Sequence, residues 1–288
     1  MAKNKPAAAK PAGTPAVHPE IRPGQSIELL KELHILTRDG QLNQDSRRKL
    51  KQVYHLYQFI EPLLAEVLAE TGDLSLADHG AGKSYLGFIL YDLFLKDKPA
   101  GTIHGIETRA ELVQRSRELA ERLGFPRMHF LDVSVEESTH SGQLPERIDV
   151  VTALHACNTA TDDAIRRGIN LGARLIVVAP CCHKELRPQL GQPEPFAPVL
   201  RHGLMEERMA EWVTDGLRAL FLEWAGYRTK VMEFVGSEHT PKNLMIAAVR
   251  EREPFVDEAA RKRIEDLKSF FGVRQHALDS LLNESGHA

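Results

Sequence analysis

The stretch L-S-L-A-D-H-G-A-G-K-S-Y-L-G-F, residues 74–88, decides the fold, because two glycines join a short apolar run to a helical one. Its end, Gly82-Lys83-Ser84, resembles the close of a loop that binds nucleoside triphosphates. Its middle, 78–82, resembles the start of a loop that wraps S-adenosylmethionine. Both interpretations predict a strand, a tight turn and a helix, with the turn facing a ligand.

The chain after Gly72 alternates short apolar runs with helical stretches. Alternation of this kind predicts a parallel sheet covered by helices on both faces. Two further runs, 228–235 and 243–249, predict a closing antiparallel pair, which makes a mostly parallel seven-stranded, Rossmann-like α/β fold. We expect the parallel strands at 74–77, 102–107, 128–132, 148–154 and 173–180, and the helices at 85–95, 110–123, 161–169 and 204–225.

The two ends of the chain have a different texture. Residues 1–24 are rich in Ala, Pro and Lys and predict a disordered basic tail. Residues 25–71 predict N-terminal helices that act as a lid or substrate region, with Asp45 capping a helix that continues to about Pro62. The cofactor domain is expected over 72–250. A C-terminal helical extension is expected over 251–288, with a break at Gly272.

Composition narrows the class of protein. The 288 residues carry a net charge of −3, so any contact with nucleic acid must come from a local patch. Three cysteines, Cys157, Cys181 and Cys182, are too few for a disulfide framework and fit a reducing compartment. The sequence shows no apolar run long enough for a bilayer and no signal core, so we expect no membrane partner and a cytoplasmic location.

The triphosphate interpretation lacks two of its parts. Ala77 stands where the loop pattern begins with glycine. The pattern also needs an apolar strand that ends in an acid to hold Mg²⁺. The fourth expected strand leads into His155 and the fifth into Cys181, so neither supplies that acid. A P-loop nucleotide hydrolase therefore remains the alternative.

The residues that an adenosyl ligand is expected to contact are present at the ends of three successive predicted strands. Asp78, Gly80 and Gly82 supply an acid and a glycine turn that a ligand can approach closely. Glu107 ends the second strand, where an acid accepts hydrogen bonds from the ribose hydroxyls. Asp132 ends the third strand beside the expected adenine. The other predicted cofactor residues are Val133 at the ring face, Lys83 as a counter-ion of the methionine carboxylate or a cap of the turn, and His155.

Three motifs together resemble a known family. These are L-A-D-H-G-A-G-K-S-Y-L at 76–86, L-H-A-C at 154–157 and A-P-C-C-H-K-E at 179–185. They are similar to the domain shared by the glutathione-S-transferase-C-terminal-domain-containing protein and the animal methyltransferase-like proteins of the rRNA adenine dimethylase-like group. The resemblance covers about residues 45–250 and implies a class I fold, S-adenosylmethionine and methyl transfer. Ser84 and Asn158 depart from the pattern, and Asn158 puts any acidic role at that position in doubt.

All three cysteines of the chain and two of its histidines follow the fourth and fifth predicted strands. Ligands of such sheets bind at the carboxyl ends of the strands, so the residues there face the reactive methyl group. A histidine could act as general base, a cysteine thiolate could add to a pyrimidine ring, or the cluster could bind Zn²⁺. Buried cysteines without any function are the plain alternative. A histidine base leads and no metal is predicted; the predicted catalytic residues are His155, Cys181, Cys182 and His183.

The acceptor is expected to be a macromolecule, with RNA favoured over protein. A basic run on the N-terminal helix precedes tyrosines, and cations beside aromatic rings can grip phosphates and bases. The family resemblance implies that Gln52 and His55 of this helix face the pocket. A cofactor-binding adaptor without turnover is the third possibility. The basic run consists of Arg47, Arg48, Lys49 and Lys51.

Overall fold

The computed structural model describes residues 18–138, 142–154, 156, 159–233, 243–252 and 257–284. The chain divides after Leu50 into two compact units, Met1–Leu50 and Lys51–Ala288. In the first unit Ser26 caps the short helix α1 (Ile27–Glu32) by accepting a hydrogen bond from the Leu29 N–H at 3.1 Å. The second unit contains the sheet and the candidate site.

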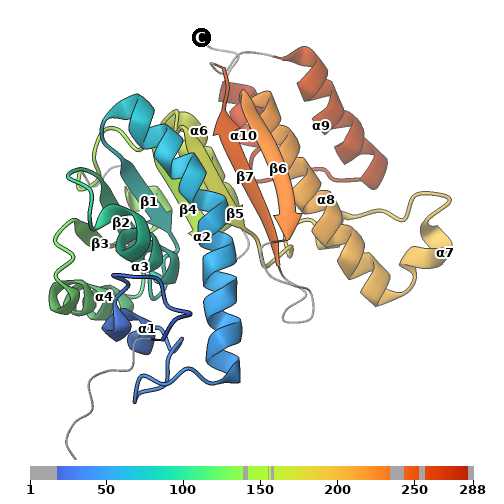
Figure 1. Ribbon diagram of the computed structural model, residues 1–288. Helices are drawn as coiled ribbons and strands as arrows, with labels where there is room; N and C mark the ends of the chain where they lie inside the picture. The colour runs from blue at the N-terminus through green and yellow to red at the C-terminus, as the bar shows by residue number, and fades with distance from the viewer. Residues whose placement is uncertain are drawn as a thin grey trace, which may run out of the picture. The chain divides into compact units, whose positions relative to one another are not determined.

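The sheet has seven strands in the order β3-β2-β1-β4-β5-β7-β6. The first five run parallel, and β7 is antiparallel to both β5 and β6. The predicted seven-stranded α/β sheet is therefore confirmed (Figure 1). The strands are β1 (Ser75–His79), β2 (Thr102–Glu107), β3 (Met128–Asp132), β4 (Val150–Leu154), β5 (Leu175–Ala179), β6 (Tyr227–Glu233) and β7 (Leu244–Arg250).

The helices between the strands begin and end close to the predicted residues. The helix after β1 starts as α-helix and finishes in one π-helical turn, Tyr91–Leu95. The sequence does not predict the short helices at 135–138, 187–189 and 197–200, because three or four residues are too few to show a helical period. The longer helices are α3 (Tyr85–Leu90), α4 (Ala110–Leu123), α6 (Ala160–Asn170), α8 (Gly203–Trp224), α9 (Glu258–Phe271) and α10 (Asp279–Glu284).

Helix α2 (Gln44–Thr71) corrects the prediction that the helix stops near Pro62. Proline removes one backbone hydrogen bond, which costs about 3 kcal/mol in a helix interior. Apolar side chains continue at helical spacing on both sides of Pro62, and their burial offsets that cost; they are Val53, Leu56, Tyr57, Ile60, Leu64 and Val67. Asn43, rather than Asp45, caps the helix, by accepting from the Ser46 N–H at 2.8 Å.

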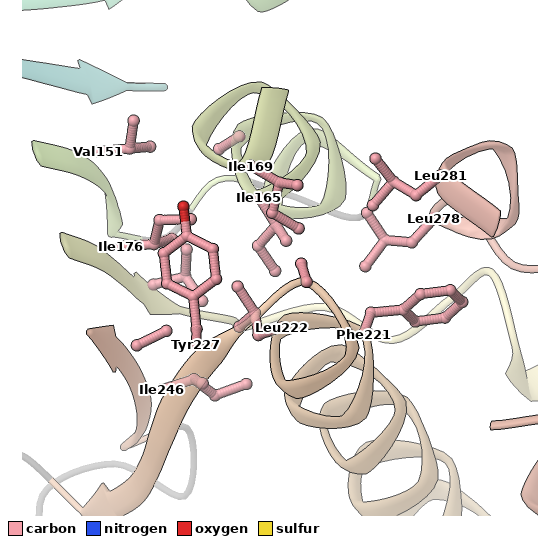
Figure 2. Close-up of a cluster of buried hydrophobic side chains, with 14 of the residues drawn as sticks. Val151, Ile165, Ile169, Ile176, Phe221, Leu222, Tyr227, Ile246, Leu278 and Leu281 are labelled. Atoms are coloured by element: carbon pink, nitrogen blue, oxygen red, sulfur yellow. The ribbon is translucent and has the colours of Figure 1, made fainter. Parts of the chain in front are cut away.

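The core of the second unit lies between the sheet and helices α6, α8 and α10. Figure 2 shows side chains of β4, β5 and β7 meeting those of the three helices. The Tyr227 hydroxyl crosses this layer and donates to the Ala173 carbonyl at 2.7 Å. The part of α2 after Leu50 covers the opposite face (Figure 1), where Lys230 of β6 lies 5.2 Å from the Phe59 ring centre.

The carboxyl ends of the parallel strands meet at one edge. Glu107 pairs with Asp132 across β2 and β3, and Leu154 pairs with Ala179 across β4 and β5. Strand β4 lies between β1 and β5. Among the helices within the described ranges, none is long and apolar enough to cross a membrane.

Candidate cofactor and acceptor site

The turn after β1 needs its glycines. Gly80 and Gly82 have φ of +63° and +58°, in the left-handed region that favours glycine. A Cβ at Gly80 would lie 3.3 Å from the Cβ of Ala156, so the turn also packs closely against the segment after β4. Ser84 adopts φ +49° and its N–H donates to the Ala81 carbonyl at 2.6 Å. This backbone therefore leaves room for a ligand where side chains would fill the turn.

Glu107 joins the end of β2 to this turn. Its Oε2 accepts a hydrogen bond from the Gly82 N–H at 2.8 Å. The Arg109 guanidinium donates to both carboxylate oxygens, through Nε at 2.9 Å and Nη2 at 3.0 Å. The Arg109 side chain and the backbone N–H groups of Arg109 and Gly82 hold the pKa of Glu107 down to about 2, against the cost of burial. The carboxylate is therefore an ionised acceptor at neutral pH.

Asp78 lies beneath the turn rather than on its surface. It is 2% exposed and accepts a hydrogen bond from the Thr152 hydroxyl of β4 at 2.7 Å. Burial raises the pKa of Asp78 to about 6. The next residue, His79, is completely buried, and burial lowers its pKa to about 3, so its ring is neutral. Asp78 thus ties β1 to β4 directly below the glycine turn.

The segment after β3 is held in shape by a capping box. The Ser134 N–H donates to Glu137 at 2.9 Å, and the Glu137 N–H donates to the Ser134 hydroxyl at 3.1 Å. This pair opens the short helix α5 (Val135–Ser138) directly after Asp132 and Val133. Asp132 is exposed at the strand end, and Val133 is half-buried against the core. Lys83 is exposed on the turn.

The segments that follow β4 and β5, here called the rim, carry the predicted catalytic residues. The structure describes them only in part. His155, Cys157 and Asn158 lie outside the described residues. Cys181 and Cys182 are half-buried thiols whose sulfur atoms lie 3.6 Å apart. Within the described part of the chain, no group of three or more His, Cys, Asp or Glu side chains has an arrangement suited to a metal ion. The zinc alternative depends on Cys157 and stays untested.

His183 is the end of a buried chain of charged groups. Its Nε2 lies 3.0 Å from Asp215 of α8. Asp215 also accepts from Arg218 at 3.0 Å, and Arg218 binds Asp162 of α6 through two hydrogen bonds of 2.8 and 2.7 Å. All four side chains are at most 8% exposed. The two aspartates compensate the buried guanidinium, and the network fixes the imidazole.

The tautomer of His183 follows from its partner. A carboxylate only accepts hydrogen bonds, so His183 Nε2 is the donor to Asp215, and in the neutral form of the ring Nδ1 carries the lone pair. The Nδ1 atom is buried and finds no hydrogen-bond partner among the residues that the structure describes. In its neutral form, a ring held in this way keeps one nitrogen that could accept a proton, as a general base requires.

A pocket of about 230 Å³ adjoins His183. Strand β5 ends at one side of it, the middle of α8 forms a wall, and the β6–β7 pair closes the other side. Trp212 stands in this wall with 65% of its surface exposed, and Asn243 is 5% exposed at the start of β7. The lining consists of Pro180, His183, Arg208, Glu211, Trp212, Asp215, Glu233, Asn243 and Leu244.

Comparison with known families identifies the chemistry. Residues 48–189 match the family model described as a methyltransferase domain. The matched span holds the glycine turn, Glu107 and Asp132, which the sequence predicts as the adenosyl site, and also the ends of β4 and β5. The protein is an S-adenosylmethionine-dependent methyltransferase. The glycine turn and the ionised carboxylate of Glu107 fit this methyl donor, which favours it over the nucleoside triphosphate alternative.

Solved structures similar to this methyltransferase are distant. A Podospora anserina methyltransferase bound to S-adenosylhomocysteine is 13% identical, with 78% of this chain and 87% of that chain covered and a TM-score of 0.47. An Aeropyrum pernix fibrillarin with natively bound S-adenosyl-L-methionine is 14% identical, covering 61% and 66%, at 0.39. A Methanococcus jannaschii fibrillarin pre-rRNA processing protein is 10% identical, covering 63% and 68%, at 0.42. No curated protein matches the chain.

Sequence reasoning about this methyltransferase missed the residues behind the rim. The sequence alone does not indicate a role for Arg109, Asp162, Asp215 or Arg218. A signal for two of them was present, since Asp215 and Arg218 interrupt the apolar stripe of α8 at a spacing of three residues. Charged residues on a stripe that faces the core must be paired, which predicts a buried network.

Proposed function

We propose that this methyltransferase transfers its methyl group to RNA and that the acceptor base enters the pocket beside His183. The observation that carries the proposal is Trp212, an exposed indole in the wall of a pocket that charged residues also line. Aromatic side chains stack on unpaired bases, and this is the common way in which single-stranded RNA is recognised.

The proposed cofactor residues lie along the ends of β1, β2 and β3. The glycine turn admits the methionyl part, the Glu107 carboxylate accepts from the ribose hydroxyls, and the segment after β3 borders the adenine. Support comes from the ionised state of Glu107 and its link to the Gly82 N–H. The full set is Asp78, Gly80, Gly82, Lys83, Glu107, Asp132, Val133 and His155, in which Asp78 supports the turn from below.

The pocket begins at the end of β5, on the same edge of the sheet as the glycine turn. Strand β4 alone separates β1 from β5. Neighbouring strands are about 4.8 Å apart, so the two strand ends are separated by roughly 10 Å along the sheet edge. S-adenosylmethionine supplies a methyl group already activated on a sulfonium. The protein must therefore align the acceptor atom and exclude water.

His183 is proposed as the general base. The bound sulfonium would give its methyl group to the acceptor nitrogen or oxygen and keep the carbon–sulfur electrons, and His183 would take the acceptor's proton on Nδ1. Asp215 stabilises the imidazolium that forms. In this proposal Cys181 and Cys182 line the approach, and His155 positions the acceptor from the end of β4.

The basic run of α2 remains a predicted RNA contact. Arg47 pairs with Glu20 at 2.8 Å, and Arg48 and Lys49 both pair with Asp45. These ion pairs are exposed and weak, so a phosphate could replace the carboxylates. Lys51 and His55 are exposed on the same helix.

Labelled methyl transfer tests the proposal. Tritiated S-adenosylmethionine is incubated with the protein and with either total RNA or total protein from a cell extract. We expect label in RNA, and Trp212→Ala should reduce it about tenfold or more, because one stacked base contributes about 1–3 kcal/mol. Phe270→Ala, which removes an exposed aromatic ring outside the pocket lining, is the matched control.

The two fractions separate the alternatives. Label in protein alone would replace RNA by a protein acceptor. Label in neither fraction, with S-adenosylhomocysteine still bound, would indicate the adaptor. Equal labelling of RNA by Trp212→Ala and by the unaltered protein would reject the pocket as the acceptor site.

A further inference from the structure

The Glu107 carboxylate is fully engaged by the protein itself. Its Oε2 accepts from Gly82 N at 2.8 Å and from Arg109 Nη2 at 3.0 Å. Its Oε1 accepts from Arg109 N at 3.1 Å, from Arg109 Nε at 2.9 Å and, at 3.4 Å, from the Thr108 hydroxyl. A carboxylate offers about four lone-pair sites, so these donors occupy all of them. A ribose can bind here only if some of these donors leave.

The donors differ in how easily they can leave. The N–H groups of Gly82 and Arg109 belong to backbone that is fixed by the β1–β2 pairing and by helix α4. The guanidinium hangs on a flexible stem, and the Arg109 side chain is 58% exposed. The guanidinium can therefore move away from Glu107 into solvent with little loss of buried surface.

The guanidinium also occupies the space beside the turn. Arg109 Nη2 lies 3.7 Å from the position that a Cβ on Gly82 would take. Gly82 is one of the two glycines that let a ligand approach the turn. Arg109 thus covers the turn and the carboxylate at once.

We propose that Arg109 is an internal competitor of the cofactor's ribose. The inference rests on the proposed placement of the ribose at Glu107. Arg109 presents two N–H donors to the carboxylate, as the ribose presents two hydroxyl donors. When the cofactor binds, its ribose hydroxyls replace the Arg109 guanidinium as donors to Glu107. At this carboxylate, the free energy of binding therefore contains only the difference between the two sets of hydrogen bonds. Arg109 weakens affinity for the cofactor, and it disfavours ligands that lack the paired hydroxyls.

Titration calorimetry with S-adenosylhomocysteine tests this. The ligand carries no sulfonium charge, so losing a cation at 109 does not by itself attract it. Arg109→Met keeps the length of the stem and should lower Kd about three- to tenfold, which corresponds to a partly exposed bidentate ion pair. Arg115→Met removes an exposed arginine from the same helix and should leave Kd unchanged.

Repeating the Arg109→Met substitution in the Glu107→Gln variant tests whether the tighter binding depends on the Glu107 carboxylate. Glu107→Gln loses the ion pair, so Arg109→Met should no longer tighten binding there. A 2′-deoxy analogue of the ligand should gain less from Arg109→Met than the parent ligand does. Thermal melting of each variant checks that it is folded.

The outcomes distinguish this inference from the proposed site. Unchanged or weaker binding in Arg109→Met, with weak binding in Glu107→Ala, overturns the competitor role and keeps the ribose at Glu107. Unchanged binding in Glu107→Ala overturns the ribose placement itself. Equal tightening in Arg109→Met and Arg115→Met would assign the effect to net charge and also overturn the inference.

Discussion

The backbone N–H of Gly82 donates to the carboxylate of Glu107 across 2.8 Å, so the turn after β1 and the end of β2 form one structural unit. The link joins residues 25 positions apart in the sequence. It places an ionised acceptor beside a backbone that lacks side chains, and these are the two features that an adenosyl ligand requires at a strand end.

Glu107→Gln should weaken binding of S-adenosylhomocysteine about tenfold or more. The amide is neutral and has a single acceptor oxygen, so it cannot receive both the turn and a ribose. Calorimetry gives the change in Kd. Glu111→Gln, on the first turn of α4 and exposed, should leave Kd unaltered. Equal affinity in Glu107→Gln and the unaltered protein would contradict the ribose assignment.

Gly80→Ala should impair the site more than its effect on stability suggests. A side chain at φ +63° costs about 1 kcal/mol, and its Cβ would press on Ala156 at 3.3 Å. Gly124→Ala is the matched control, because Gly124 has φ +67° with no atom within 4 Å of its Cβ position. Both variants should melt earlier, and only Gly80→Ala should lose cofactor affinity. Loss of affinity in both would argue against a specific role for the turn.

Asp78 should make stability depend on pH. Burial raises the pKa of Asp78 from 3.8 to about 6, so between these values the folded protein binds a proton that the unfolded chain has lost. Stability therefore falls as pH rises through this window, and the loss is complete above it. Asp78→Asn keeps an oxygen for Thr152 and removes the buried charge. At pH 8 it should be about 2–3 kcal/mol more stable, since one pKa unit is worth about 1.4 kcal/mol.

Urea denaturation between pH 4 and 8 measures this difference. The advantage of Asp78→Asn should shrink as pH falls below about 6. Glu185 has a pKa that burial, with Asp162 nearby, raises to about 7, and it contributes the same slope to both proteins. Parallel curves for the two proteins would show that Asp78 does not carry a buried charge.

Asp215→Asn should spare cofactor binding and reduce turnover about a hundredfold. An asparagine amide can donate to His183 Nε2, which moves the ring hydrogen to Nδ1 and removes the basic nitrogen. Arg218 keeps its two bonds to Asp162, so the fold should survive. The loss should fall on kcat rather than KM and should change the acid side of the pH–rate profile. Glu211→Gln, in the same pocket lining, is the control. Full turnover in Asp215→Asn would exclude the proposed base.

The sequence predicted the sheet well because local signals and tertiary structure agree there. Residues 102–107, 110–123 and 128–132 match the observed elements to the residue. Each is an apolar run or an amphipathic stretch bounded by Gly, Pro or a charged residue. The predicted helix end near Pro62 was wrong because a proline is a local signal for a helix end. The buried apolar stripe that keeps α2 helical through Pro62 is a property of the whole helix.

The sequence could predict a candidate site residue only where its position at the end of a strand is enough to suggest its role. The cofactor roles predicted for Glu107 and Asp132 follow from their places at the ends of β2 and β3. Arg109 and Asp215 do not, because their roles depend on partners that only the folded chain brings near. Asp215 lies 32 positions from His183, and Asp162 lies 56 positions from Arg218. Pairing over such separations leaves no local pattern beyond charges on an apolar stripe.

A crystal structure of the protein with S-adenosylhomocysteine tests the central claim most directly. We predict that the ribose hydroxyls lie within hydrogen-bond distance of Glu107, with the Arg109 guanidinium moved away and the amino-acid end of the ligand against Gly80 and Gly82. A ligand bound elsewhere, with the Glu107–Arg109 ion pair intact, would contradict the account.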